Sequence, residues 1–87
     1  MFRITEQDSP ANGLTLRLEG RLSGRNVDEL RRICRDIDDS RHITLDLDGL
    51  TWLDDEGVAA ILELMDRDAT VSRCKPFVRH LLRRPQL

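Results

Sequence analysis

The residues of this chain best suited to chemistry are three consecutive carboxylates, Asp54, Asp55 and Glu56, followed by Gly57. An apolar pattern at helical spacing comes next, which predicts a helix start with Asp54 as its N-cap. Adjacent side chains there point in different directions, so these three acids cannot chelate one metal ion by themselves. Each would instead stabilise the helix by roughly 0.3–1 kcal/mol through the helix dipole. The pattern predicts fixed negative charge at a helix tip and no metal.

A second group of acids, Asp46 and Asp48, lies in the run Asp-Leu-Asp-Gly after an apolar strand. This run resembles the nucleophile motif of haloacid-dehalogenase-type phosphatases, in which one Asp attacks phosphorus beside Mg²⁺. Strand alternation puts both acids on the solvent face, and Lys75 is the only Lys available downstream. A small Mg²⁺-dependent phosphatase-like enzyme is therefore a distant alternative, and we expect the chain not to be an enzyme.

The thiols and imidazoles do not form a recognisable ligand set. Cys34 and Cys74 lie in no C-x-x-C motif, and His42 and His80 are far apart in the sequence. Both cysteines are expected to be reduced and partly buried. No cofactor is expected.

Charge is unevenly distributed along the chain. Residues 44–66 hold seven acids and no base, whereas residues 67–87 hold six bases and one acid. One interpretation is that the blocks mark a binding face. The other is that they attract each other across the fold, and the sequence does not choose between them.

The basic end could in principle bind nucleic acid through Arg73, Lys75, Arg79, Arg83 and Arg84. The acidic block would repel phosphate, and cations near a helix C-terminus complement its dipole in any case. With two Phe, one Trp and no Tyr, the chain also offers few rings for stacking on bases. No nucleic-acid partner is expected.

Four strands are predicted to position these groups, over residues 1–6, 14–19, 43–48 and 70–74. The second and third alternate Leu or Ile with polar residues, which indicates one buried face and one solvent face. Asn12-Gly13 predicts a hairpin turn. Gly20–Gly24 is expected to break the second strand, and Gly49 to end the third.

Three helices are predicted between and after the strands. The first covers 27–38, with Asn26 as N-cap and Glu29 completing a capping box. The second follows Asp54, and the third begins at Pro76. The resulting α/β order, β-β-α-β-α-β-α, predicts a small mixed sheet with helices packed mainly on one face.

The 87 residues are expected to form one domain, 1–87, with a modest aliphatic core. No apolar run is long enough to span a membrane, and the first residues do not read as a signal peptide. A cytoplasmic location is expected.

The ordered set of motifs resembles the STAS family of anti-sigma-factor antagonist domains. The central segment ITLDLDGLTWLDDEGVAAILELM is similar to the family's strand, short link and Asp-Ser-Ser/Thr-Gly helix start. Upstream, LTLRLEGRLSGRNVDEL resembles the family's second strand, turn and first helix. Downstream, TVSRC and KPFVRHLL resemble its last strand and closing helix. The resemblance implies the STAS fold and a regulatory, non-catalytic role in protein–protein interaction and signalling.

The chain departs from the family pattern where a partner kinase would act. Glu56 occupies the place of the phosphorylated hydroxyl, so a phosphomimetic, locked or divergent partner switch is expected. The resemblance also places the turn around Ser23 near this helix start. Ser23 and Thr51 are the only substitute phosphorylation sites considered.

The expected partner-binding residues are Ser23, Asp54, Asp55, Glu56 and Gly57. The resemblance implies an anti-sigma factor or another kinase-like ATPase as the partner. The alternative is a STAS subunit of a transporter-associated or stress-signalling complex. Exposed strand edges would also permit a homodimer.

Overall fold

The computed structural model describes residues 1–83 and has the expected order of elements. They are β1 (Phe2–Ser9), β2 (Gly13–Leu22), α1 (Arg25–Arg35), β3 (Ile43–Leu53), α2 (Asp55–Asp66), β4 (Thr70–Arg73) and α3 (Pro76–Leu82). The predicted start of α2 at Asp55 and of α3 at Pro76 is confirmed.

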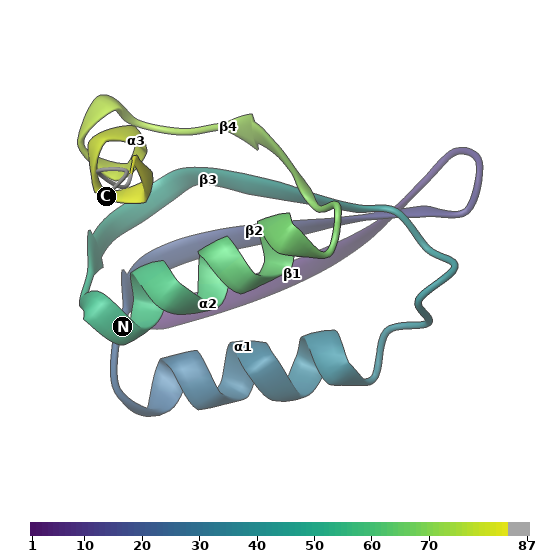
Figure 1. Cartoon of the computed structure of the whole chain (residues 1–87). Helices are drawn as coiled ribbons and strands as arrows, with labels where there is room; N and C mark the ends of the chain where they lie inside the picture. The colour runs from purple at the N-terminus through teal and green to yellow at the C-terminus, as the bar shows by residue number, and fades with distance from the viewer. Residues whose placement is uncertain (84–87) are drawn as a thin grey trace.

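The four strands form one mixed sheet in the order β1-β2-β3-β4. The β1–β2 pair is antiparallel, whereas β2, β3 and β4 run parallel. The two crossover helices, α1 and α2, lie side by side on one face of the sheet, and α3 packs against β3 and α2 (Figure 1). The predicted α/β architecture with helices mainly on one face is therefore confirmed.

The core lies between the sheet and the helices and is mostly Leu. Inward-facing residues of the two central strands, including Leu16, Leu18, Leu45 and Leu47, are fully buried against α1, α2 and α3. Their outward-facing neighbours Thr15, Arg17, Asp46 and Asp48 are half-buried or exposed. The alternation predicted for both strands is therefore present, and it leaves the other sheet face open.

Both central strands run further than predicted, because their glycines do not end them. At Gly20, φ is +94°, and the β2–β3 register shifts between Gly20 and Arg21. The strand continues to Leu22 because Arg21 N–H donates to the Met1 carbonyl at 2.9 Å. Gly49 lies inside β3, where an added Cβ would be 2.7 Å from Cγ of Glu19. Gly20 thus allows an irregularity within β2, and Gly49 relieves crowding against Glu19 within β3.

The predicted cap of the first helix is wrong. Helix α1 begins at Arg25, with Gly24 as its N-cap, and ends at Arg35. Gly24 takes φ 56° and ψ −125°, a conformation open chiefly to glycine, which turns the chain early enough for Asn26 to lie inside the helix. The Asn26 side-chain amide donates instead to the Arg21 carbonyl at 2.9 Å.

The hairpin predicted at Asn12-Gly13 forms, but it closes one residue earlier than the motif implies. Gly13 N–H donates to the Pro10 carbonyl at 3.3 Å, and Gly13 already belongs to β2. The two residues with positive φ are Ala11 (60°) and Asn12 (63°). The two central residues of the turn are therefore Ala11 and Asn12, both in the left-handed conformation, whereas the motif implies Asn12 and Gly13 as the central pair.

Candidate functional site

Asp54 fixes the start of α2 with both of its carboxylate oxygens. Oδ1 accepts a hydrogen bond from Gly57 N–H at 2.7 Å, which confirms the predicted N-cap. Oδ2 accepts from Gly24 N–H at 3.2 Å. One half-buried side chain thus joins the helix start to the turn between β2 and α1. Both of its carboxylate oxygens accept hydrogen bonds from backbone N–H groups of the same chain.

Gly57 lets the helix start approach β2 closely. A Cβ at this position would collide with the Leu22 carbonyl oxygen, so a side chain would push α2 away from the end of β2. Gly57 itself is buried and cannot touch a partner. It can contribute to a docking face only by positioning the exposed residues beside it.

Asp55 and Glu56 are the acids that reach solvent at this helix start. The Glu56 side chain is 69% exposed, and its Oε2 lies 3.4 Å from Nη1 of Arg31. With Asp54 occupied internally, Asp55 and Glu56 carry the accessible negative charge.

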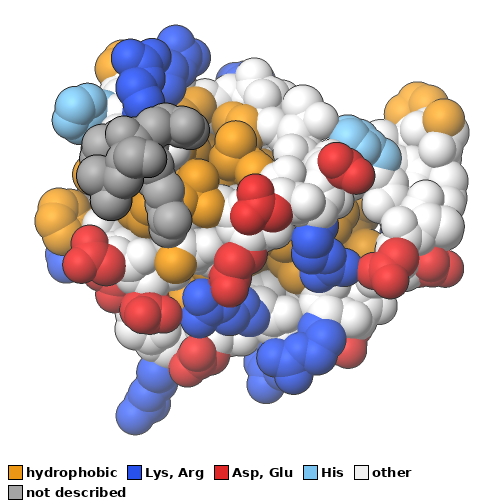
Figure 2. All heavy atoms as spheres, in the orientation of Figure 1, with side chains coloured by type: hydrophobic (Ala, Val, Ile, Leu, Met, Phe, Trp, Pro, Cys, Tyr) orange, Lys and Arg blue, Asp and Glu red, His pale blue; other side chains and the backbone are white. Residues whose placement is uncertain are grey.

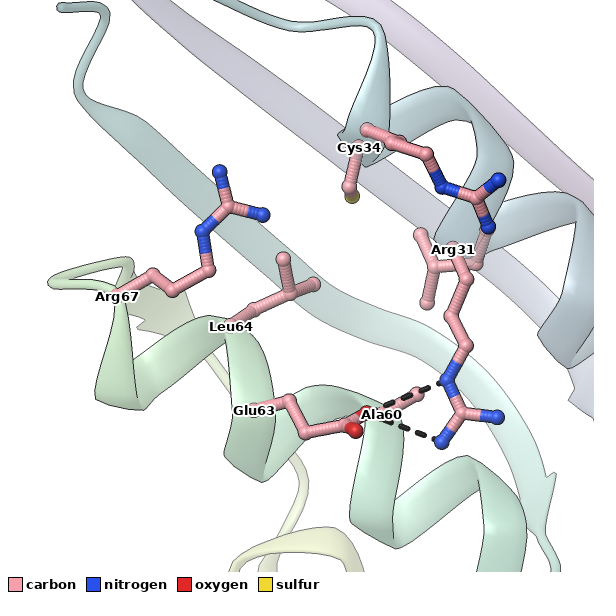
Figure 3. A pocket seen from close by; sticks show the side chains of 8 residues that line it. Arg31, Cys34, Ala60, Glu63, Leu64 and Arg67 are labelled. Carbon is pink, nitrogen blue, oxygen red and sulfur yellow. Dashed lines mark hydrogen bonds and ion pairs between the residues drawn. The ribbon is translucent and has the colours of Figure 1, made fainter. Parts of the chain in front are cut away.

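Arg31, on α1, is a contributor that sequence reasoning missed. Besides Glu56, it binds Glu63 Oε2 through Nη2 at 2.9 Å and through Nε at 3.2 Å (Figure 3). The hydrogen bonds that Arg31 donates to Glu63 are the main cause that raises the pKa of the Arg31 guanidinium. Spacing along one helix would not reveal this contact, because Arg31 and Glu56 are separated by 25 residues and lie on different elements.

Ser23 lies half-buried in the turn that Asp54 holds against α2. Its carbonyl accepts from Asn26 N–H at 3.1 Å, which helps to shape the turn. The expected proximity of this turn to the α2 start is confirmed through the neighbouring Gly24. Thr51 is exposed on β3.

The other candidate groups are distributed away from this helix start. Asp46 and Asp48 are adjacent on the open sheet face, where Asp46 Oδ1 accepts from Asp48 N–H at 3.1 Å. In residues 1–83, no group of three or more His, Cys, Asp or Glu side chains could hold a metal ion.

Both cysteines have pKa values above that of an ordinary thiol. Cys34 is buried at the floor of a groove between α1 and α2 (Figure 3), and desolvation raises its pKa to about 11. Desolvation also raises the pKa of the half-buried Cys74. Both thiols are therefore protonated near neutral pH and have little nucleophilic character.

The acidic and basic blocks do not pair with each other in the described part of the chain. Its ion pairs join Arg31 to Glu56 and Glu63, Arg41 to Asp8, and Arg67 to Asp39. Arg31 lies outside the basic block, and Asp39 lies outside the acidic one. Mutual attraction through direct contact therefore does not explain the charge asymmetry within residues 1–83. None of the helices described over those residues is long and apolar enough to cross a membrane.

Comparison with solved structures places this geometry among known folds. The chain is similar to the anti-sigma factor antagonist SpoIIAA in its unphosphorylated form, at 18% identity over 91% of this chain and 80% of that chain, with a TM-score of 0.70. It is also similar to the antisigma-factor antagonist STAS domain from Rhodobacter sphaeroides, at 21% identity over 83% of each chain and a TM-score of 0.56. A structure of Mglu matches at 19% identity over 83% of this chain and 19% of that one, with a TM-score of 0.65.

These solved structures share the fold at low sequence identity, and no match is found among curated proteins. The family model described as the STAS domain matches residues 2–87, nearly the whole chain. The chain therefore belongs to the STAS domain family.

Proposed function

We propose that this chain is a non-catalytic regulatory module that binds a protein partner through the exposed start of α2. The docking face, which we call the helix-start surface, consists of Ser23, Gly24, Asp55 and Glu56 and is held in place by Asp54 and Gly57. The observation that carries the proposal is the exposed Glu56 carboxylate beside a turn fixed by Asp54.

Glu56 gives this surface a charge that does not depend on a modifying enzyme. In the family pattern a hydroxyl stands here, and its phosphorylation adds about −1.5 to −2 charges. A carboxylate supplies one negative charge permanently, and Arg31 offsets part of it. The surface therefore imitates a weakened phosphorylated state that cannot be reversed.

An acidic surface of this kind fits a partner with a positive patch. Complementary charges raise association rates and make them sensitive to salt. Two of the similar solved structures are anti-sigma factor antagonists, which supports an anti-sigma factor or a related kinase-like ATPase as the partner class.

The test is to capture the partner with the full chain as bait and then to measure its affinity for variants. Glu56→Ser removes the fixed charge and should weaken binding by about fivefold or more, roughly 1 kcal/mol, with little change in stability. Arg31→Gln should act in the opposite direction, because it removes the cation that offsets Glu56.

Glu29→Ser is the matched control, since Glu29 is an exposed acid on α1 and should leave the affinity unchanged. Equal affinities for the natural chain and Glu56→Ser would refute the proposed role of the helix-start surface. A cognate kinase that phosphorylates this helix start in the natural chain would refute the permanent switch. Capture of a transporter ATPase would favour the transporter-associated role over the anti-sigma one.

A further inference from the structure

A second surface feature lies away from the α2 start, where the end of α2, β4 and α3 meet. It is a hollow of about 410 Å³, which we call the β4–α3 groove. Its lining residues are Met65, Val71, Ser72, Arg73, Cys74, Arg79, Leu82 and Arg83.

The groove has an apolar lining that the described chain does not fully cover. Met65 is 39% exposed, and Val71, Cys74 and Leu82 are half-buried. Figure 2 shows hydrophobic side chains reaching the surface between α3 and β4, with Lys and Arg side chains close by. Apolar surface bordered by charge is typical of an interaction site.

Three arginines line this groove together with the apolar residues. Arg73, Arg79 and Arg83 are exposed, and none forms an ion pair with an acid among residues 1–83. Arg73 is the register partner of Asp46, but no ion pair forms between them. Arg79 lies close enough to Cys74 for its charge to oppose the rise in that thiol's pKa. The groove thus combines unneutralised positive charge with apolar contact area.

The strand beside the groove has a free edge. In the described chain, β4 is the last strand of the sheet and pairs only with β3. Backbone N–H and C=O groups on such an edge can hydrogen-bond to an added extended segment. Alternate side chains of that segment would then face the groove.

We propose that the β4–α3 groove binds an extended peptide segment of a partner protein in which acidic and apolar residues take turns at every second position, so that both kinds lie on the face of the segment that meets the groove. Its carboxylates would pair with Arg73, Arg79 and Arg83, and its apolar side chains would cover Met65 and Leu82. A polyanion such as nucleic acid fits less well, because the acidic α2 would repel a long phosphate backbone. This site is separate from the helix-start surface and does not depend on its function.

The test is an NMR titration of the full ¹⁵N-labelled chain with the synthetic octapeptide Ser-Glu-Ser-Leu-Ser-Glu-Ser-Leu, in which Glu and Leu share one face of the extended peptide. The amide signals of residues 71–74 and 79–83 should shift, and those of α1 should not. Replacing every Glu by Lys, or every Leu by Ser, should abolish these shifts at the same concentration.

Variants of the chain locate the site further. The double variant Arg79→Glu, Arg83→Glu should weaken peptide binding by about tenfold or more, because it reverses two groove charges. Arg25→Glu is the matched control, since Arg25 is an exposed arginine at the start of α1, and it should leave binding unchanged. Glu56→Ser should also have no effect, which separates this test from that of the helix-start surface. Spectra of each variant without peptide verify that it is folded.

Four results would overturn the proposal. The first is no shift, or shifts outside the groove, and the second is equal binding of the Lys peptide. The third is binding only when the chain is ended at Arg83, which would show that its own C-terminal residues occupy the groove. The fourth is a stronger response to decanoate than to the peptide, which would assign the groove to an anionic lipid.

Discussion

Arg31 determines how much charge the start of α2 presents. Its guanidinium is shared between Glu56 and Glu63, which lie about two turns apart on the same face of α2. The sequence predicts the Asp54 cap because capping depends on residues three positions apart. It does not predict the Arg31 contact, because that contact depends on how α1 packs beside α2.

Cys34 is a residue whose burial should be visible as a pH dependence of stability. Its thiol pKa is raised from 9.0 to about 11, with desolvation as the main cause. Burial therefore favours the protonated thiol, and this contribution to stability is complete below pH 9. It is lost as the pH rises from 9 towards 11, by up to about 2–3 kcal/mol.

Urea unfolding between pH 7 and 11 checks this expectation. The natural chain should lose more stability above pH 9 than Cys34→Ala, although the variant is less stable at neutral pH because of its cavity. Cys74 is present in both proteins, so its own titration cancels in the comparison. Parallel pH profiles for the two proteins would show that Cys34 ionises as an ordinary thiol.

At the scale of elements, the sequence predicts which segments form and in which order, but not where each ends. Leu alternation identifies β2 and β3, and helical spacing identifies α1 and α2. Errors fall at Gly20, Gly49 and Asn26, and also at the ends of β1 and α1. A glycine is compatible with a turn, a bulge or a close contact, and only the neighbouring strand decides between them.

Gly57 is the glycine whose contact should matter most for the position of a helix. In an exposed helix Gly→Ala would stabilise by about 1 kcal/mol. Here the added methyl would collide with the Leu22 carbonyl, which belongs to the backbone and cannot move alone. Gly57→Ala should therefore destabilise the chain, by roughly 1–3 kcal/mol.

Denaturant unfolding measures this effect, with Glu56→Ala as the neighbouring control. The control replaces an exposed side chain in the same helical turn and should change stability by less than about 1 kcal/mol. A Gly57→Ala chain more stable than the natural one would mean that α2 can move away from β2 without cost.

At the scale of the whole molecule, the acidic block (residues 44–66) forms no ion pair with the described part of the basic block (residues 67–83). The acidic residues of α2 meet Arg31 from α1, whereas the arginines of β4 and α3 stay unpaired among residues 1–83. The sequence shows the asymmetry but leaves open whether the blocks neutralise each other. The fold settles whether the blocks neutralise each other. It packs the acidic α2 beside Arg31 of α1, and it places Arg73, Arg79 and Arg83 around the β4–α3 groove.

Arg41 holds the β1–β2 hairpin in place at one end of the sheet. It lies in the loop between α1 and β3 and bonds to residues 8–13, which are far from it in the sequence. Its Nη2 donates to Asp8 Oδ1 at 2.7 Å and to the Gly13 carbonyl at 2.8 Å, and its Nε donates to the Asn12 carbonyl at 3.3 Å. These bonds fasten the β1–β2 hairpin to the loop between α1 and β3. The planar fork of arginine makes them together, and a lysine ammonium cannot reproduce that geometry.

Arg41→Lys should therefore keep the charge but loosen the hairpin, at a cost of about 1 kcal/mol in the free energy of unfolding. Hydrogen exchange provides the sharper measurement, because the amides of residues 9–14 should exchange faster while those of the Leu-rich centre of β2 and β3 keep most of their protection. Arg17→Lys, on the open sheet face, is the control and should change neither quantity. If protection at residues 9–14 is unchanged in Arg41→Lys, charge alone holds the hairpin. If it falls equally throughout the sheet, the hairpin and the core unfold as one unit, and Arg41 stabilises the whole molecule instead of one end of it.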